Sequence, residues 1–506
     1  MIHRTSCPLI LAVVVSTLLS AATAKTYYVA PGGSDDASGG LNSPFASWAK
    51  AQSAVSAGDT VLFRAGTYTY TKALRSCNSQ TDNVNAVQLD KNGSSGKLIH
   101  YMAYPGETPV FDYFQMKDDC RIRGVYVPGS YLHLKGLELR GVPQNNNLNH
   151  ENWCIYITGS HNIFELLNTH HNMGPGVIIW GGSDNLVLNC DSHDNFDEHT
   201  SNGAGESADG FGAHTNATGT TGNIFRGCRA WWNTDDGYDC ITNKEVAIFE
   251  NCWAWLNGYK PGTTTGIGNG NGFKLGGYGL PPSNPPASPP ENIARFCLSF
   301  LNRSAGFYQN HHIADNLFYN NTAYKNGVNF NMLGYNGGDR SMGIYKNNIA
   351  FSGTVSSNGP GTQATNNSWN LSAAPSASDF TSLDTAGISG PRKPGGDLPD
   401  VPFMHLAGSR YTDKGVDLGF PFNGAAPDLG AFETGPTALA EHGQKNNRQP
   451  QSAVLSEVPL GGRTDVYDIS GRKRLPGAAN RSGAVVIYVS KTVEGVPHTS
   501  VGLMMR

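Results

Sequence analysis

The chain has 506 residues and a formal net charge of −4 at pH 7, and only 15% of its residues are charged. This balance excludes the strongly basic surface that non-specific nucleic-acid binding requires. With 62 glycines and frequent asparagine, the composition favours a turn-rich β protein over a helical one.

The N-terminus has the pattern of a secretory signal peptide. Arg4 supplies a positive charge, the apolar run "LILAVVVSTLL" follows, and "ATA" at 22–24 is a small-residue cleavage site. The apolar run is too short to span a membrane. We therefore expect residues 1–24 to be removed and the protein to be secreted, into the medium or to the cell surface.

Residues 42–68 predict a short amphipathic helix followed by a first strand. Such a unit is suited to cover the open end of a β core, where strand edges would otherwise be exposed. Because a secreted chain can form disulfides, Cys77 and Cys120 are candidates to bridge near this cap.

A repeat of 23 or 24 residues runs through the middle of the chain. Its signature is a cysteine followed five residues later by an asparagine, in "CDSHDN", "CRAWWN", "CWAWLN" and "CLSFLN", each after a short apolar run. A fixed period of this size is typical of a solenoid. Since the scaffold of leucine-rich repeats is missing, we predict an all-β fold, a right-handed parallel β-helix.

Equivalent residues of successive coils stack about 4.8 Å apart in such a fold. The repeated cysteines would form a buried column of reduced thiols. The repeated asparagines would form a ladder of side-chain amides at a bend. The cysteines are Cys190, Cys228, Cys252 and Cys297, and the asparagines are Asn172, Asn195, Asn233, Asn257, Asn302 and Asn326.

The third strand of each coil follows a glycine and gathers charged residues. The residue after the glycine is large and apolar in every coil, so period-two alternation points the next one outward. The predicted outward column is Ile178, Gly212, Asp239, Lys274, Tyr308 and Asn329. The residue before the glycine stacks Asp209 beside Asp236. We predict that these carboxylates and Asp235 converge from two coils, with Lys274 one coil further on.

Two insertions interrupt the repeat next to these residues. The spacing grows to 38 residues between Cys190 and Cys228 and to 45 between Cys252 and Cys297. Loops that leave a regular solenoid around one place are predicted to form the walls of a binding site.

Four carboxylates on neighbouring coils are hard oxygen ligands suited to Ca²⁺. Two carboxylates about 5 Å apart repel by roughly 3 kcal/mol at an effective dielectric constant of ~20. We expect a bound cation, rather than pairing with basic residues, to offset this repulsion. Lys274 is a candidate general base, because a nearby divalent cation opposes its charged form. The combination suits β-elimination of a uronate polymer, with the C5 proton abstracted and the O4-linked sugar expelled.

These motifs resemble polysaccharide lyase family nine over residues 26–433. The stretches "SADGF", "TDDGYD", "GNGFKLGG", "NRSAGFYQN" and "PDLGAFE" occur in the family's order. The resemblance implies a β-helix pectate lyase, or a relative that cleaves rhamnogalacturonan, acting on acidic plant cell-wall polysaccharide. It also implies Ca²⁺ as the cofactor. The ligands implied are Asp209, Asp235, Asp236 and Asp239, and the base implied is Lys274.

Two other functions stay open from the sequence. A polygalacturonase-type hydrolase would need an acid and a base flanking the bond, and it would leave Lys274 without a role. A non-catalytic β-helix that binds wall polymers around a structural Ca²⁺ would likewise have no need of Lys274. No general acid is assigned; Tyr308, one coil beyond Lys274, is the candidate.

Other ionisable residues are interpreted more simply. His214, His311 and His312 are predicted as surface or bend residues, because hard Ca²⁺ prefers oxygen. Six basic residues are candidates to meet a uronate carboxylate, although a plain surface charge is the simpler interpretation of each: Arg226, Arg229, Lys244, Lys260, Arg295 and Arg303.

The end of the chain has three parts. The stretch "GAAPDLGAFE" (424–433) is predicted to close the second end of the coil, so that the β-helix domain spans 25–435. Residues 436–460 are polar and typical of a linker. Residues 461–506 alternate like two strands of a small β module, similar to the sorting or anchoring modules of exported bacterial proteins. We expect a monomer without a membrane span.

Overall fold

The computed structural model describes residues 23–144, 151–200, 203–356 and 359–435, and three short strands between 464 and 490. The chain divides into two compact units, residues 1–450 and 451–506. The predicted signal peptide, apart from residues 23 and 24, and the predicted linker lie outside the described residues. Among the helices described, none has the length and apolarity needed to cross a membrane.

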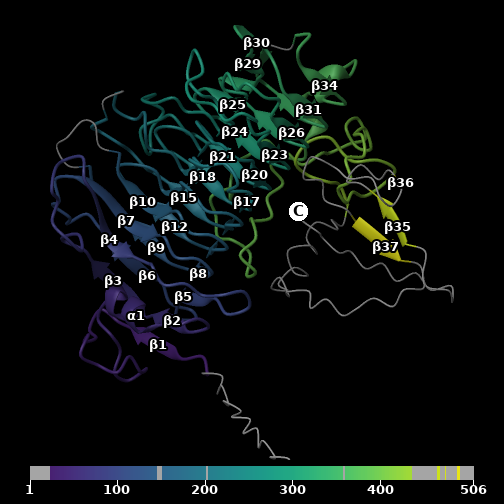
Figure 1. The fold of residues 1–506 in the computed structure, drawn as a ribbon. Helices are drawn as coiled ribbons and strands as arrows, with labels where there is room; N and C mark the ends of the chain where they lie inside the picture. The colour runs from purple at the N-terminus through teal and green to yellow at the C-terminus, as the bar shows by residue number, and fades with distance from the viewer. Residues whose placement is uncertain are drawn as a thin grey trace, which may run out of the picture. The chain divides into compact units, whose positions relative to one another are not determined.

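Three parallel sheets wind around one core in the larger unit, and the strands stack in chain order from the purple end of the ribbon to the green (Figure 1). The first sheet contains β1 (Thr26–Val29), β2 (Thr60–Phe63), β5 (Ile99–Ala103), β8 (Leu132–Lys135), β11 (Ile163–Glu165), β14 (Leu186–Leu188), β17 (Asn223–Arg226), β20 (Ala247–Glu250), β23 (Ile293–Arg295), β26 (Leu317–Tyr319), β31 (Ile344–Lys346) and β34 (Gln363–Thr365). The second contains β3 (Gly66–Thr69), β6 (Pro109–Asp112), β9 (Glu138–Arg140), β12 (Asn168–His170), β15 (Asp191–His193), β18 (Arg229–Trp231), β21 (Trp253–Trp255), β24 (Leu298–Phe300), β27 (Thr322–Tyr324) and β32 (Ile349–Phe351).

The third sheet contains β4 (Asn83–Gln88), β7 (Arg121–Val127), β10 (Trp153–Ile157), β13 (Val177–Ile179), β16 (Phe211–Ala213), β19 (Tyr238–Asp239), β22 (Phe273–Lys274), β25 (Ala305–Tyr308), β28 (Val328–Asn331) and β33 (Val355–Ser356). A coil contributes one short strand to each sheet in turn, and neighbouring strands within a sheet run parallel. The predicted parallel β-helix is confirmed.

The N-terminal cap is built around one short helix, α1 (Trp48–Ala54). The Ser47 hydroxyl accepts a hydrogen bond from the Lys50 amide at 3.1 Å and so caps the helix. Trp48 is fully buried against Phe63 and Phe111, as expected for a cover over the core. One detail of the prediction is wrong. Strand β1 precedes the helix and pairs with β2, so the strand after the helix is the second of the sheet.

The predicted side-chain columns are present inside the coil. Asn233 Nδ2 donates to Asn257 Oδ1 at 3.1 Å, and the same bond recurs along the ladder. The four stacked cysteines are buried free thiols, as predicted. A disulfide joins Cys77 to Cys120. The amide ladders satisfy bend groups that burial would otherwise leave unpaired.

The outward column is wrong in its last position. Tyr308 pairs in register with Asn331, not with Asn329, because the register between β25 and β28 is shifted by two residues from the glycine pattern. Asn329 instead ends the amide ladder, where its Oδ1 accepts from Asn326 Nδ2 at 3.1 Å.

The segment 424–433 does not close the end of the coil. Its backbone runs along the flank of the last coils, where the Asp428 carbonyl accepts from Asn320 Nδ2 at 3.0 Å and the Ala431 amide donates to Thr322 Oγ1 at 2.9 Å. At the end itself, Trp369 of the 3₁₀ turn η1 (Ser368–Asn370) packs on Phe330 at 5.0 Å. The predicted cap is therefore corrected to a flanking strap.

Three smaller elements complete the larger unit: a hairpin of β29 (Leu333–Tyr335) and β30 (Asp339–Ser341), and the 3₁₀ turn η2 (Ala377–Asp379). The smaller unit contains one antiparallel sheet in the order β36 (Lys473–Arg474), β35 (Thr464–Tyr467), β37 (Ile487–Ser490). The sequence predicts two strands here, and the described residues of this unit form three.

Candidate functional site

The third sheet brings the predicted charged residues together. Asp239 lies in register with Gly212 on one side and with Lys274 on the other, and Tyr308 follows Lys274. The Asp236 amide donates to Asp209 Oδ1 at 3.1 Å, which places these two side chains on adjacent coils.

The four aspartates form two overlapping groups of oxygen ligands. One oxygen each from Asp209, Asp235 and Asp236 lie within 4.8 Å of one another, and so do ligand atoms of Asp209, Asp239 and His214. The aspartates are buried, with at most 4% of any of them exposed. Asp235 Oδ1 is buried and has no hydrogen-bond partner. An unpartnered buried carboxylate oxygen fits a site for a cation.

Lys274 pairs with two members of this group. Its Nζ lies 2.9 Å from Asp236 Oδ2 and 3.2 Å from Asp239 Oδ2. Lys274 therefore offsets part of the repulsion at these two carboxylates, and the offset by a bound cation stays a prediction. Asp209 and Asp235 form no ion pair within the described ranges.

The four aspartates and Lys274 together carry more negative than positive charge when the carboxyl groups are ionised. Burial raises the pKa of Asp209 well above its usual range, and the neighbouring Asp235 adds to this effect. Burial likewise raises the pKa of Asp235, with Asp236 adding to it. Burial alone would lower the pKa of Lys274, but the carboxylates of Asp236 and Asp239 outweigh it and raise that pKa well above its usual range. One ammonium faces four carboxylates, an arrangement that a divalent cation would balance.

His214 belongs to the site, although the sequence analysis placed it at the surface. It is 8% exposed, its Nε2 lies 3.9 Å from Asp239 Oδ2, and this nitrogen has no hydrogen-bond partner. Burial lowers its pKa, which favours the neutral imidazole. The signal was available, because extending the period-two alternation by one step from Gly212 points residue 214 outward.

The other two histidines lie outside the cluster. His312 is fully buried, accepts from the Gly277 amide at 3.0 Å and lies 2.7 Å from the Pro290 carbonyl, so it fixes a bend. His311 is half-buried beside Asp339 at 2.9 Å.

The two insertions meet beside the carboxylates. Asn269 Nδ2 donates to a carboxylate oxygen of Glu206, which joins the loop before β22 to the loop before β16. Gly268 has room only for a hydrogen, because a Cβ there would meet the carbonyls of Gly205 and Thr234. Burial, and next the charge of Asp236, raise the pKa of Glu206. The loops therefore stand as a wall next to the cluster.

Three of the six basic residues proposed as uronate contacts are paired elsewhere, whereas Arg303 donates to the Gly268 carbonyl in the loop beside the cluster. Arg226 and Arg295 pair with Glu250 on the first sheet, and Arg229 pairs with Asp191 on the second. Arg123, on β7 of the third sheet, is a further basic residue on this sheet that the sequence analysis missed. It precedes the cysteine repeat, so no column led to it.

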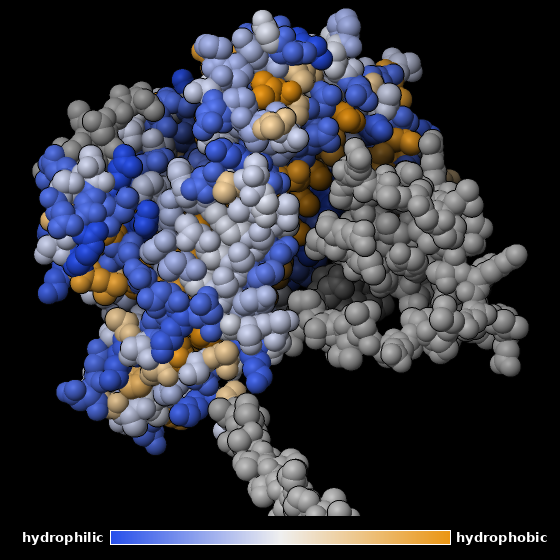
Figure 2. Space-filling model, viewed as in Figure 1, coloured by the Kyte–Doolittle hydropathy of each residue, from blue (hydrophilic) through white to orange (hydrophobic). Residues whose placement is uncertain are grey.

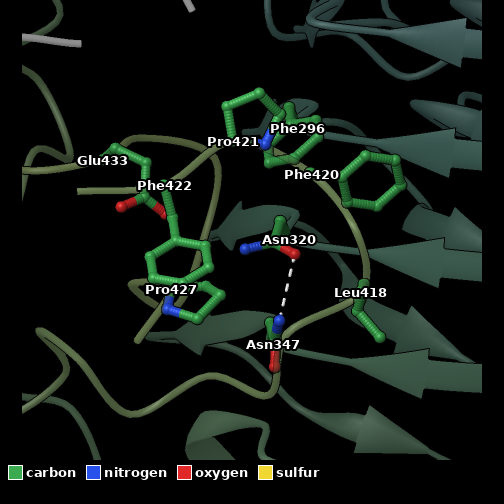
Figure 3. A pocket seen from close by; sticks show the side chains of 9 residues that line it. All are labelled: Phe296, Asn320, Asn347, Leu418, Phe420, Pro421, Phe422, Pro427 and Glu433. Carbon is green, nitrogen blue, oxygen red and sulfur yellow. Dashed lines mark hydrogen bonds between the residues drawn. The ribbon is translucent and has the colours of Figure 1, made fainter. Parts of the chain in front are cut away.

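A small pocket lies away from the aspartates. One side is formed by residues that follow strands of the first sheet, and the other by residues between 418 and 433 (Figure 3). Its lining is mostly apolar, and Asn347 Nδ2 donates to Asn320 Oδ1 at 3.2 Å inside it. The lining residues are Phe296, Asn320, Asn347, Leu418, Phe420, Pro421, Phe422, Pro427 and Glu433. The face of the larger unit in view in Figure 2 is mostly hydrophilic, with hydrophobic residues in small patches. We interpret the pocket as a packing seam.

Comparisons with known proteins agree with the fold. A family model described as a Pel9A-like, right-handed β-helix region matches residues 27–358. Pectate lyase L of Dickeya chrysanthemi is 36% identical over 421 residues, which cover 81% of this chain and 91% of that protein. Pectate lyase L of Paenibacillus polymyxa is 32% identical over 356 residues, which cover 65% and 70%.

Solved structures give the same result. A rhamnogalacturonan lyase superposes with a TM-score of 0.72 at 38% identity, covering 76% of this chain and 96% of that one. The pectate lyase Pel9A superposes with a TM-score of 0.67 at 34% identity, covering 82% and 97%. The chain therefore belongs to the Pel9A-like right-handed β-helix family, and with it to the pectate lyase-like polysaccharide lyases.

Proposed function

We propose that this protein cleaves pectic uronate polymers, polygalacturonate or rhamnogalacturonan, by Ca²⁺-dependent β-elimination. The observation that carries the proposal is the placement of one buried lysine amine among four buried aspartates on the outer face of the third sheet. Its relatives, a pectate lyase and a rhamnogalacturonan lyase, support the same class of substrate.

Asp209, Asp235, Asp236 and Asp239 would hold the ion. When bound, Ca²⁺ supplies a positive charge that engages the sugar carboxylate and makes the adjacent C5 proton more acidic. His214 is neutral and lies at the edge of the carboxylates, where it limits the space around Asp239.

Lys274 acts as the general base in its neutral form. It takes the proton from C5, the electrons of that C–H bond form the C4–C5 double bond, and the bond from C4 to the leaving oxygen breaks. The leaving oxygen takes a proton from water or from Tyr308, the register neighbour of Lys274. Burial raises the pKa of Tyr308 to about 12, so this hydroxyl keeps its proton at neutral pH.

The proposed reaction is tested by identifying its product. Incubation with polygalacturonate and with rhamnogalacturonan, each with and without chelator, should give a product that absorbs in the ultraviolet, formed only when Ca²⁺ is present. Reducing ends without absorbance would assign a hydrolase instead, and binding without any product would assign a non-catalytic protein.

We further propose that the protein is secreted as a monomer, and that residues 436–460 link the β-helix domain (25–435) to a sorting or accessory module (461–506). Detection of a mature N-terminus at Lys25 in exported protein would support this, and retention of residues 1–24 would contradict it.

A further inference from the structure

A second cluster lies on the outer face of the third sheet, in the coils before the aspartates. It consists of Arg123, three aromatic residues whose rings contact its guanidinium (Tyr126, Trp153 and Tyr156), and Trp180, which stacks on Tyr156. Arg123 lies in register with Trp153, and Tyr126 lies in register with Tyr156. We call these five residues the Arg123 cluster.

The guanidinium of Arg123 is held by aromatic rings rather than by a carboxylate. Its Cζ lies 4.0 Å from the ring centre of Tyr156, 4.8 Å from that of Tyr126 and 5.6 Å from that of Trp153. Arg123 forms no ion pair in the part of the chain that the structure describes. Its Nε is buried and has no hydrogen-bond partner, and the same is true of Trp153 Nε1.

A guanidinium stacked on rings keeps its charge and its N–H groups. Two N–H groups on one edge of it can donate parallel hydrogen bonds to the two oxygens of one carboxylate. Buried N–H groups without partners are costly, so in functional proteins they mark places where a ligand completes the hydrogen bonds. The ligand that satisfies both the charge and the fork of donors is an anion with a planar carboxylate.

The Arg123 cluster is continuous with the aspartate site. In register along the third sheet, Tyr156 is followed by Ile178, then Gly212, then Asp239. Three steps of about 4.8 Å separate Tyr156 from Asp239 by about 14 Å.

Between the two clusters the face carries a row of rings. Trp180 stacks on Tyr156 at 5.7 Å and lies 6.0 Å from the ring of His214, which in turn contacts Asp239. Ile178 is fully buried beneath this row, and Gly212 is buried beside it, where a Cβ would meet Ile178 at 3.0 Å. A polymer laid along the row of rings would reach both clusters.

We propose that Arg123 binds the carboxylate of a second uronate residue of the polymer, four coils before Asp239, with the partly buried rings of Tyr126 and Trp180 as sugar-stacking walls. The identity of the polymer rests on the proposed function. The carboxylate-binding role rests on the geometry of the Arg123 cluster.

The experiment measures binding by calorimetry in the Lys274→Met background, with Ca²⁺ present, so that the ligand is not consumed. The ligands are a long oligogalacturonate, its carboxyl-reduced form, and digalacturonate, which is too short to reach both clusters. We expect Arg123→Gln to raise the Kd for the long oligomer about 10- to 100-fold. The Kd values for the reduced oligomer and for digalacturonate should change less than two-fold. Arg226→Gln, which removes an arginine from the first sheet, is the matched control and should leave all three Kd values unchanged.

Arg123→Lys provides a second variant that keeps the charge but loses the fork, and we expect an intermediate loss of affinity. A thermal unfolding midpoint within about 2–3 °C of the parent shows that the fold is kept. Unchanged Kd for the long oligomer in both variants overturns the proposal, and so does an equal loss for digalacturonate. A wild-type protein that binds the oligomer through Arg123 but makes no absorbing product overturns the proposed function and leaves this inference standing.

Discussion

Replacement of Lys274 by methionine separates the chemical step from the metal site. Methionine has a similar length and fills the same buried volume, but it cannot accept a proton. In the wild type, Nζ lies about 3 Å from oxygens of both Asp236 and Asp239. The substitution therefore removes a base and also a positive charge that sits among the metal ligands.

The two effects have opposite signs. Loss of a general base lowers kcat by typically 10²- to 10⁴-fold, which corresponds to about 3–5 kcal/mol in the activation barrier. At about 3 Å and an effective dielectric constant of ~20, each lysine–aspartate contact has a Coulomb attraction on the order of 5 kcal/mol before desolvation is counted. Because this ammonium competes with a cation for the same carboxylates, we expect the variant to bind Ca²⁺ at least as tightly as the wild type.

Two measurements test this reasoning. Initial rates of ultraviolet-absorbing product give kcat and KM on polygalacturonate and rhamnogalacturonan at saturating Ca²⁺. Calorimetry in buffers of different ionisation enthalpy counts the protons released when Ca²⁺ binds. We expect the wild type to release more protons than the variant at pH 8, because the pKa of Lys274 is raised well above its usual range when only the carboxylates surround it.

A suitable control is Lys135→Met, since Lys135 forms a 2.7 Å ion pair with Glu165 on the first sheet. It should match the wild type in rate and in proton release. If Lys274→Met keeps kcat within a few-fold of the wild type, Lys274 is not the base. If it loses Ca²⁺ affinity instead, the lysine supports the ion site rather than competing with it.

Three further outcomes follow from the same structure. Asp235→Asn should abolish the calorimetric Ca²⁺ isotherm while the apo protein stays folded, because an amide replaces a buried carboxylate that lacks a partner; a wild-type isotherm would remove Asp235 from the ligand set. With chelator, the melting temperature should fall as pH rises from about 5 to 8. The reason is that burial raises the pKa of carboxyl groups such as Asp209 in the folded state, so their ionisation in this range destabilises the fold. Added Ca²⁺ should reverse the fall, and a melting temperature that does not change with pH would argue against the buried cluster. Asn257→Ala should cost about 2–4 kcal/mol in urea unfolding, because it leaves the amide groups of Asn233 unpaired and opens a cavity; a cost below about 0.5 kcal/mol would mean that the ladder adds little stability.

Much of the site follows from the repeat. A β-helix stacks equivalent residues at a fixed distance, so the period of the cysteines and asparagines suffices to place Asp209 beside Asp236 and Asp239 beside Lys274. Period-two alternation then decides which side chains point outward. These inferences need only the order of residues along the chain, because in a solenoid each coil contacts its immediate neighbours.

Sequence-based prediction fails for residues that lie outside the regular stacking of equivalent positions. The predicted position of Asn329 is wrong because the register between β25 and β28 is shifted by two residues, which no spacing records. Arg123 lies before the repeat is recognisable, and the strap at 424–433 returns from far along the chain to contact Asn320 and Thr322. Such contacts depend on how irregular segments pack.

The sequence by itself determined the β-helix, its stacked columns and the gathering of four aspartates and a lysine, since all of these follow from one period and one alternation. Only the tertiary structure decided that Lys274 pairs with Asp236 and Asp239, that His214 is buried beside them, and that Arg123 lies on the same face. The physical reason is that burial and pairing depend on the direction and surroundings of each side chain. Those are set by the insertions and by neighbouring coils together, not by the position of a residue in its repeat.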